Sequence, residues 1–350
     1  MKILIIQQKM IGDVLLASII PKNLKKLYPS SVVFFLCNKH AAPVLKNNPH
    51  VDKLIAIEEK KLQHPGSLLK IAYSIKVQKF DLIIDPYAKL GSQFLSLCSG
   101  AKQRISYKKN TLPGAYTHQV LFSKKDLSVY GKALDERLNL LKVLAPNFNF
   151  EVKPELYLTS EEIKAGKESL NSVNPNRKTI MFGILGSTLN KSMPVSYTIA
   201  VINFLTKNYN VNIIFNYLPS QRQLVQEILK SVIPSNKIYP HIFEEDLRNF
   251  IKLAYHCDAI IANEGGSVHI AKAFNKPTFT IFSPFIPKSS WGTFENEPQN
   301  KSIHLKDIKP ELFIEKSKKQ LYLERKSLYQ ELKPAYIIKE LQAFMQANSF

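Results

Sequence analysis

The stretch that decides the fold reads Asp258-Ala-Ile-Ile-Ala-Asn-Glu-Gly-Gly-Ser-Val-His-Ile-Ala-Lys-Ala-Phe-Asn-Lys-Pro-Thr-Phe-Thr-Ile-Phe-Ser-Pro284. A short apolar run is followed by an acid with two glycines, a helical pattern, an Asn-Lys-Pro stop and a second apolar run. This order predicts a strand, a tight turn, a helix and another strand. It is the repeating unit of a parallel α/β sheet.

The turn in this unit is the first candidate for binding a ligand. Gly265 and Gly266 free the turn from Cβ atoms and let a ligand approach the backbone. The first turn of the following helix has unpaired N–H groups and a partial positive charge, which suit a phosphate. Glu264 and His269 lie five residues apart, so one ligand could meet a carboxylate and an imidazole. An ordinary helix start, with Ser267 as cap and His269 half-buried, fits the same pattern.

The run from Asn263 to Thr278 resembles the signature of glycosyltransferase family 9, the heptosyltransferase type. There the pattern usually reads Asn-Asp-Ser-Gly, two residues, His-x-Ala-x-Ala, and then Gly-x-Pro-Thr before a strand. Family members are two-domain GT-B enzymes that move heptose from ADP-heptose onto the inner core of lipopolysaccharide. This chain has Glu264 where aspartate is usual and Gly265 where serine or threonine is usual. Both changes fall on the nucleotide-sugar contact.

Size and composition are those of an ordinary soluble globular protein. The 350 residues suffice for one large or two ordinary domains, and 45% of them are hydrophobic. Three cysteines, Cys37, Cys98 and Cys257, have no metal or redox spacing, and their odd number argues against a disulfide framework. Neither a cleavable signal nor an apolar run as long as a membrane span is present. We therefore expect a cytoplasmic protein.

The formal net charge of +20 has two explanations. Lysine is scattered through nearly every segment, and only six of the 48 basic residues are arginine, which fits a compositional bias. Attraction to the anionic cytoplasmic face of the inner membrane, with peripheral association, is the functional explanation. We expect no nucleic-acid partner, because bidentate recognition favours arginine and no nucleic-acid module occurs.

Apolar runs alternate with helical patterns in the first half of the chain, which predicts a doubly wound parallel sheet. The expected strands cover residues 3–6, 31–36, 54–57 and 81–85. The family resemblance continues here, because Gly12-Asp13 and the runs 48–52 and 80–85 fall where the family has counterparts.

Asp13 is the candidate catalytic base. It follows the first expected strand, at whose carboxyl end open α/β sheets place their ligand crevice. Sugar transfer to a hydroxyl needs a base that takes the proton as the nucleophile attacks the anomeric carbon. In the family the aspartate of the Gly-Asp pair has this role, and Gly12-Asp13 matches it residue for residue. Capping of the first helix is the alternative role.

Residues 86–118 are expected to be loop-rich and to face the acceptor. Gly100-Ala-Lys-Gln-Arg-Ile105 resembles a family turn that leads toward the acceptor. The resemblance implies acceptor contacts for Lys89, Lys102 and Arg104, although the family's usual arginine near position 91 is missing. A solvated basic loop is the alternative.

The second half repeats the strand–helix pattern after a join at residues 150–177. Its loop Gly186-Ser-Thr-Leu-Asn-Lys-Ser-Met-Pro194 resembles a family loop that ends in Lys-x-Trp-Pro. In the family this lysine neutralises the donor diphosphate, and Lys191 matches it. An exposed lysine in a turn is the alternative. The resemblance also implies donor contacts for Gly186, Ser187 and Gln221, the last at a position where the family often has a glutamate on the ribose.

The resemblance as a whole implies a GT-B fold, with two Rossmann-like doubly wound domains facing a central cleft. We expect an acceptor-side domain at 1–160, a nucleotide-sugar domain at 175–325, and a helix in 326–350 that packs back on the first domain.

The implied activity is inverting, metal-independent transfer of heptose from ADP-heptose to an anionic lipid-linked core saccharide. The donor would be held by Lys191, Glu264, Gly265, Gly266 and His269. A metal-dependent GT-A enzyme would carry Asp-x-Asp, which does not occur in the chain, so no metal or other cofactor is expected. Another nucleotide-sugar enzyme of this fold, such as an epimerase, and a non-catalytic glycan- or lipid-binding relative are the alternatives.

Overall fold

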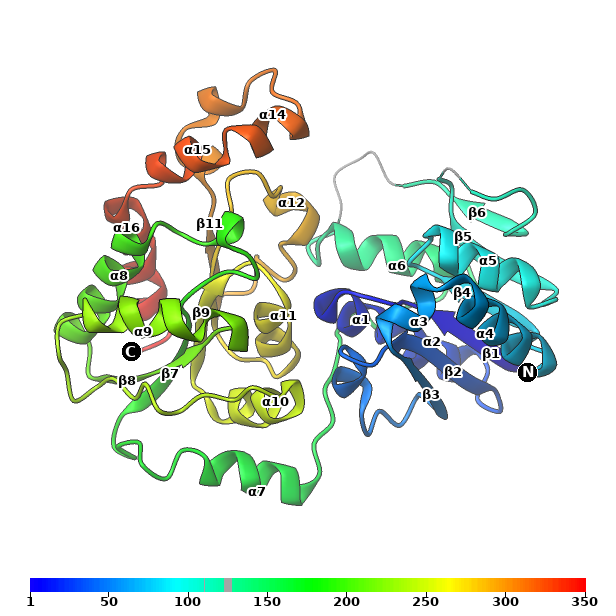
Figure 1. Ribbon diagram of the computed structural model, residues 1–350, viewed down its shortest axis with the longest axis horizontal. Helices are drawn as coiled ribbons and strands as arrows, with labels where there is room; N and C mark the ends of the chain where they lie inside the picture. Colours follow the sequence, from blue (N-terminus) through cyan, green and yellow to red (C-terminus); the bar gives the residue numbers. More distant parts are fainter. Residues whose placement is uncertain (110, 123–127) are drawn as a thin grey trace. The chain divides into compact units, whose positions relative to one another are not determined.

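The computed structural model describes residues 1–109, 111–122 and 128–350. The chain divides into two compact units, Met1–Tyr157 and Leu158–Phe350, each built on a parallel β-sheet (Figure 1). No helix in these described ranges is long and apolar enough to cross a membrane.

Within the described part of the first unit, the sheet has six parallel strands in the order β3-β2-β1-β4-β5-β6. The strands are β1 (Lys2–Ile6), β2 (Val32–Asn38), β3 (Lys53–Ile57), β4 (Leu82–Asp85), β5 (Gln103–Tyr107) and β6 (His118–Val120). The helices are α1 (Ile11–Ala17), α2 (Ile19–Leu27), α3 (Glu59–Gln63), α4 (Pro65–Val77), α5 (Leu90–Cys98), α6 (Lys132–Lys142) and the 3-10 turn η1 (Ala42–Leu45). This is a doubly wound order that reverses between β1 and β4.

The central strands of this sheet are apolar along nearly their whole length. β1 reads Lys-Ile-Leu-Ile-Ile and β4 reads Leu-Ile-Ile-Asp, as expected for parallel strands covered by helices on both faces. Leu4, Ile6 and Ile83 lie in one core cluster with residues of α4 and α5, which pack against each other. α1, α2 and α6 contact one another and form a separate helix layer. The doubly wound sheet predicted from the sequence is confirmed.

The prediction of a loop-rich stretch at 86–118 is wrong, because α5 and β5 lie inside it. β5 reads Gln-Arg-Ile-Ser-Tyr, and only Ile105 and Tyr107 give it an apolar pattern. Pairing with β4, in which Leu82 lies opposite Gln103, makes this polar segment a strand. Tertiary pairing thus overrides a weak local preference.

Within the described residues of the second unit, the sheet order is β11-β10-β9-β7-β8. The strands are β7 (Lys178–Gly183), β8 (Val211–Asn216), β9 (Ala259–Asn263), β10 (Thr278–Ile281) and β11 (Asn300–Ile303). The helices are α7 (Ser160–Glu168), α8 (Val195–Asn208), α9 (Arg222–Lys230), α10 (Leu247–His256), α11 (Gly266–Ala273), α12 (Lys288–Trp291), α13 (Leu305–Ile308), α14 (Lys318–Leu323), α15 (Arg325–Glu331) and α16 (Pro334–Ala347). The 3-10 turns are η2 (Leu189–Lys191), η3 (Pro219–Gln221) and η4 (Pro310–Phe313). This is the other common doubly wound order, and it reverses between β7 and β9.

The stretch 258–284 forms β9, α11 and β10, as the sequence predicts. β9 and β10 pair in parallel, with Ile260 opposite Thr278. Helix α7, in the segment expected to join the domains, belongs to the second unit. Arg248 of α10 donates to both carboxylate oxygens of Glu162 in α7, from Nε at 2.9 Å and from Nη2 at 2.6 Å. This buried bidentate pair holds α7 against α10.

The C-terminal helix α16 is part of the second unit, and its expected packing on the first domain stays a prediction. α16 contacts α8, β10 and β11 of the second unit (Figure 1). Its apolar face, formed by Ile337, Leu341, Phe344 and Met345, is buried in the core of that unit. The ring of Phe344 lies 5.7 Å from that of Phe279 in β10. The apolar face of α16 therefore covers this part of the second sheet.

Phe344→Ala should destabilise the second unit by about 3–5 kcal/mol, because it leaves a cavity between α16 and the sheet. Trp291 is the only tryptophan of the chain and lies in this unit, so its fluorescence reports the urea unfolding of this unit. Lys339→Ala, an exposed change on the same helix, is the matched control and should unfold like wild type. An unchanged unfolding midpoint for Phe344→Ala would place α16 outside the core.

Candidate active site

The candidate donor site lies where the strand order of the second sheet reverses, between β7 and β9. In doubly wound sheets, ligands bind in the crevice outside the carboxyl ends of the strands at such a point. Residues 184–194 follow β7, and the turn of Glu264 and Gly265 follows β9. Lys191 and Glu264 are far apart in the sequence and meet at this edge of the sheet.

The loop after β7 folds back on itself and holds Lys191 at its end. Ser192 Oγ accepts a hydrogen bond from the Gly186 amide at 2.9 Å and donates one to the Thr188 carbonyl oxygen at 2.9 Å. A Cβ at Gly186 would lie 2.5 Å from the Lys191 carbonyl oxygen. Glycine is required at this position because any side chain would push the Lys191 backbone away.

Glu264 is buried and faces Lys191. Glu264 Oε1 lies 3.5 Å from Lys191 Nζ, and the side chains of Glu264 and Lys191 are 6% and 32% exposed. Burial raises the pKa of Glu264, whereas the Ser283 amide and the charge of Lys191 act in the opposite direction. The carboxylate therefore positions an ammonium group that an anionic ligand can still reach.

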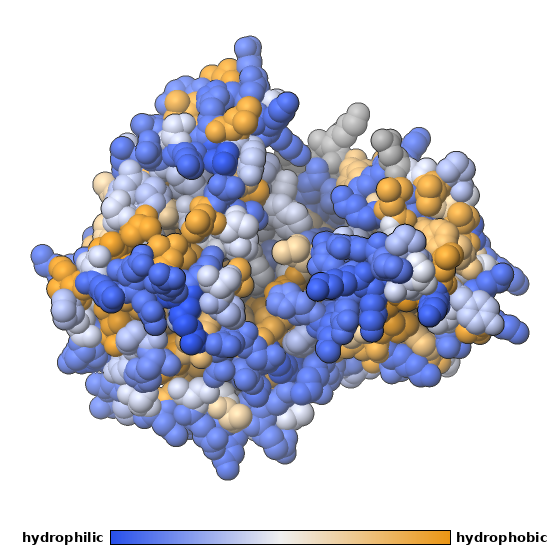
Figure 2. Space-filling view, viewed as in Figure 1, coloured by the Kyte–Doolittle hydropathy of each residue, from blue (hydrophilic) through white to orange (hydrophobic). Residues whose placement is uncertain are grey.

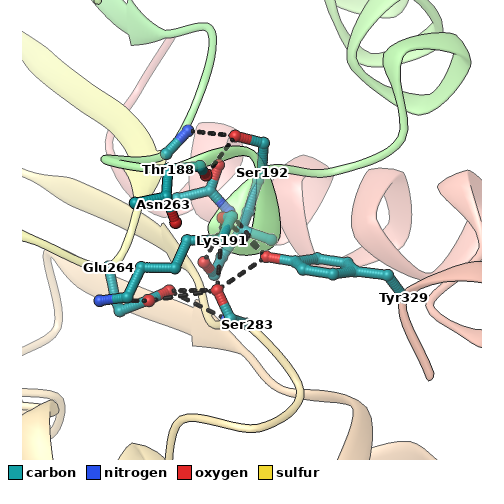
Figure 3. A network of polar contacts seen from close by, with 9 residues as sticks. Thr188, Lys191, Ser192, Asn263, Glu264, Ser283 and Tyr329 are labelled. Carbon is teal, nitrogen blue, oxygen red and sulfur yellow. Dashed lines mark hydrogen bonds and ion pairs between the residues drawn. The ribbon is translucent and has the colours of Figure 1, made fainter. Parts of the chain in front are cut away.

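Two residues that the sequence analysis did not single out complete this network (Figure 3). The Ser283 amide donates to Glu264 Oε2 at 2.9 Å, and Ser283 Oγ lies 3.1 Å from both carboxylate oxygens. The Tyr329 hydroxyl lies 2.9 Å from Ser283 Oγ and 2.9 Å from the Lys191 carbonyl oxygen. Asn263 Nδ2 donates to the same hydroxyl at 3.2 Å. α15 thus contributes a buried tyrosine that fastens the lysine loop to the end of β10.

The helix after the two glycines is α11, and its N-cap is Gly265 rather than Ser267. Gly265 has no side chain with which to cap the first-turn N–H groups. Apart from Gly265 itself and its two neighbours in the chain, no described residue has an atom within 4 Å of the position that a Cβ at Gly265 would occupy. The turn is therefore open beside a helix N-terminus, and Gly266 begins that helix.

His269 is buried, whereas an ordinary helix start was expected to leave it half-buried. It lies one turn into α11, and its Nδ1 is 3.3 Å from Thr293 Oγ1. Lys272, three residues further, is also buried and donates to the Thr293 carbonyl oxygen and to Glu295, both at 2.5 Å. These contacts anchor α11 to the segment that follows α12, and donor contact by His269 remains a prediction.

Gln221 contacts Gly186, and Ser187 is the residue that follows Gly186 in the chain. Gln221 Nε2 donates to the Gly186 carbonyl oxygen at 2.8 Å, and its Oε1 accepts from the Leu218 amide at 2.9 Å. The glutamine therefore ties the turn after β8 to the loop after β7. Ser187 is exposed beside it.

Asp13 is the third residue of α1, close to the carboxyl end of β1 in the first unit. The Met10 amide donates to its Oδ2 at 3.3 Å, so Asp13 does contribute to capping the helix. Arg137 of α6, a residue that the sequence analysis missed, donates from Nη2 to Oδ1 at 2.8 Å. Arg137 is buried, and its Nη1 donates to the Ala133 carbonyl oxygen. The arginine fixes Oδ1 and leaves Oδ2 with a single long hydrogen bond.

The three expected acceptor residues have different environments. Arg104 is committed to the fold, since it donates to the carbonyl oxygens of Ala101, Gly114 and Ala115 and so closes the turn around β5. Lys89 is exposed as the N-cap residue of α5, and Lys102 is exposed directly before β5. An acceptor role therefore fits the two lysines better than the arginine.

Groups of three or more His, Cys, Asp or Glu side chains that could hold a metal ion are absent from the described residues. The expectation of a metal-free reaction stays a prediction.

The two doubly wound sheets and the likeness to solved structures give the chain the GT-B fold. The chain belongs to glycosyltransferase family 9 (heptosyltransferase), whose model matches residues 68–318.

Relatives and solved structures agree with this assignment. Lipopolysaccharide heptosyltransferase 1 of Campylobacter coli is 23% identical over 290 residues, which are 81% of this chain and 84% of that protein. The crystal structure of a family 9 glycosyltransferase from Veillonella parvula matches with a TM-score of 0.79 at 16% identity and covers 99% of this chain and 97% of its own. The ADP-heptose lps heptosyltransferase II of Escherichia coli matches with a TM-score of 0.69 at 16% identity and covers 95% of this chain and 99% of its own. At these sequence identities, the likeness to solved structures is evidence for the fold alone.

Glu264→Asp should lower the free energy of unfolding of the second unit by about 1–3 kcal/mol, because a shorter carboxylate leaves the buried Ser283 amide without its acceptor. Urea unfolding followed by Trp291 fluorescence measures the change. Glu311→Asp, the same substitution at an exposed position, should have no effect. Equal stability of the two variants would mean that the bonds from Glu264 to Ser283 are dispensable.

Proposed function

We propose that this protein is an inverting, metal-independent glycosyltransferase. It transfers heptose from ADP-heptose to the core of a lipopolysaccharide or lipooligosaccharide. The observation that carries the proposal is Lys191, held by a buried carboxylate where the second sheet changes direction, next to an open glycine turn and a helix N-terminus.

On the donor side, Lys191 and the first turn of α11 supply positive charge for the diphosphate. This charge matters most as the sugar leaves, because the negative charge on the departing diphosphate grows in the transition state. Gly265 and Gly266 let the phosphates approach the backbone. Ser187, Gln221 and His269 complete the proposed donor contacts.

On the acceptor side, Asp13 is the proposed general base. The hydrogen bond from Arg137 holds Asp13 Oδ1 in place, which also fixes the orientation of Oδ2. The oxygen of the acceptor hydroxyl attacks the anomeric carbon, and Asp13 Oδ2 accepts the proton of that hydroxyl. The bond between the sugar and the diphosphate breaks as the new bond forms. Attack on the face opposite the leaving group inverts the configuration at that carbon.

The acceptor proposed for this chain is an anionic, lipid-linked saccharide at the cytoplasmic face of the inner membrane. What supports this is the name of the Campylobacter coli relative, a lipopolysaccharide heptosyltransferase, together with the net charge of +20. Lys89 and Lys102 are the proposed acceptor contacts, and the protein associates peripherally with the membrane.

A second candidate function is transfer from a different nucleotide sugar. Glu264 directs its carboxylate to Ser283, and Gly265 leaves open space in the turn. Both features alter the part of the pocket that meets the nucleotide sugar. A panel of ADP-, GDP- and UDP-sugars separates this candidate from heptose transfer.

The reaction itself is tested with ADP-heptose and a soluble core saccharide, with Asp13→Asn compared to wild type. Wild type should transfer the sugar, whereas Asp13→Asn should lower kcat roughly 10²–10⁴-fold, because asparagine cannot accept the proton. ADP affinity, measured by calorimetry, should stay unchanged and serves as the internal control. A variant that turns over at the normal rate would return Asp13 to a capping role.

Lys191→Ala should weaken ADP binding roughly 10- to 100-fold and lower kcat as well, because a charged partner of the diphosphate is lost. Lys230→Ala, an exposed lysine on α9, is the matched control. EDTA should leave the wild-type rate unchanged. Inhibition by EDTA that Mg²⁺ or Mn²⁺ reverses would overturn the metal-free proposal, and unaltered ADP affinity of Lys191→Ala would overturn the role of the lysine.

A further inference from the structure

Helix α4 carries an apolar stripe on its exposed side. Leu69, Tyr73 and Val77 follow one another at intervals of four residues, so they line one face of the helix. They are 58%, 70% and 52% exposed. The opposite side of α4 supplies Ala72 and Ile75 to the core of the first unit. The stripe is therefore not used by the fold of its own unit.

The segment that carries this stripe has charged residues of a single sign. Between Glu59 and Asp81 the chain has no acidic residue, and its basic residues there are Lys60, Lys61, Lys70, Lys76 and Lys79. Lys70 and Lys76 lie beside the stripe on α4, and both are exposed. Within the part of the chain that the structure describes, no ion pair is found for Lys70, Lys76 or Lys79. Apolar side chains are thus framed by uncompensated positive charge.

The neighbouring helix extends this surface. α5 packs against α4 and exposes Leu90 and Leu97. From residue 86 to residue 125 the sequence has no acidic residue. Figure 2 shows hydrophobic side chains interrupting the hydrophilic surface on the part of the first unit that carries these helices.

We infer that the exposed face of α4, together with α5, is the surface by which the protein docks on an anionic lipid bilayer. An interfacial helix combines an apolar face with flanking lysines, and tyrosine is enriched at the level of the head groups. Lysine stems can lie along the apolar region while their ammonium groups reach lipid phosphates. The inference rests on the membrane association proposed above and names the surface responsible.

Two other occupants fit this face less well. A second copy of the chain would bring two lysine-rich faces together, and like charges across an interface oppose association. Nucleic acid would use the lysines but offers little to aliphatic side chains such as Leu69 and Val77, and no arginine lies on α4. A lipid bilayer uses both the charge and the apolar stripe.

This surface adjoins the candidate acceptor side of the first unit. α5 begins at Lys89 and Leu90, after β4, and β4 pairs in parallel with β1. The start of α5 and Asp13 therefore follow neighbouring strands at the same edge of the sheet. A membrane-bound acceptor would meet the protein at this edge.

Co-sedimentation with vesicles tests the inference on the full chain. Wild type should bind phosphatidylcholine vesicles that contain about 30% phosphatidylglycerol and should bind pure phosphatidylcholine weakly, because the attraction requires acidic lipid. Raising NaCl from about 0.1 M to about 0.5 M should release much of the bound protein. Binding to neither kind of vesicle would overturn the inference.

Two triple variants identify the surface. Lys70→Gln with Lys76→Gln and Lys79→Gln should weaken binding to anionic vesicles at least about tenfold, since each nearby lysine contributes up to about fivefold. Leu69→Ser with Tyr73→Ser and Val77→Ser should also weaken it about tenfold. Exposed residues of the second unit supply the controls. The control for the lysine variant combines Lys164→Gln, Lys167→Gln and Lys230→Gln, and the control for the serine variant is Ile233→Ser. Control variants that lose as much binding as the α4 variants would overturn the assignment.

Further readouts separate this surface from other partners and from the proposed activity. The α4 variants should transfer sugar to a soluble core saccharide at the wild-type rate, which also shows that they fold. Vesicle binding without any sugar transfer would refute the proposed function and leave the surface intact. Sugar transfer without vesicle binding would refute the docking surface and leave the proposed function intact. Concentration-dependent dimerisation abolished by the serine variant would assign the face to a second copy and overturn the lipid inference.

Discussion

The candidate donor site depends on the hydrogen bonds between Glu264 and Ser283. A buried carboxylate is costly unless charged or hydrogen-bonding partners compensate it. Here the partners come from both neighbours of the central strand β9, because Ser283 follows β10 and Lys191 follows β7. One side chain therefore couples the ends of three adjacent strands. The position of Lys191, the proposed partner of the diphosphate, is therefore set by the arrangement of the strands as well as by its own loop.

Tyr329 extends this coupling to the tail of the chain. Its hydroxyl contacts the Lys191 backbone and Ser283, while Leu328 and Leu332 beside it are buried in the same core as α16. The tail thus has two roles in the second unit, since it covers the sheet and positions the loop that carries Lys191. Changes in the packing of the tail should be felt at Lys191 because interiors are close-packed and transmit strain.

The sequence predicts those features that depend on local pattern and on sheet topology. β9, α11 and β10 follow from apolar runs, glycines and an Asn-Lys-Pro stop. The grouping of Lys191 with Glu264 was implied by the family resemblance, and the structure brings the two side chains together at one edge of the parallel sheet. Ser283 and Tyr329 were missed because a serine and a tyrosine acquire their roles only through tertiary placement. Arg137 had a local signal, since it lies on the apolar face of α6 with Leu134 and Leu138.

The two departures from the family signature act together. A glutamate at position 264 reaches the amide and hydroxyl at the end of β10, and a glycine at position 265 leaves open space in the turn. Drift without function would be expected to leave buried polar groups unpaired, because nothing would select for their partners. Both oxygens of Glu264 are instead paired and Lys191 is still held in place. Glu264 and Lys191 thus keep their partners beside an open turn, whereas the buried Oδ1 of the neighbouring Asn263 has no hydrogen-bond partner among the described residues.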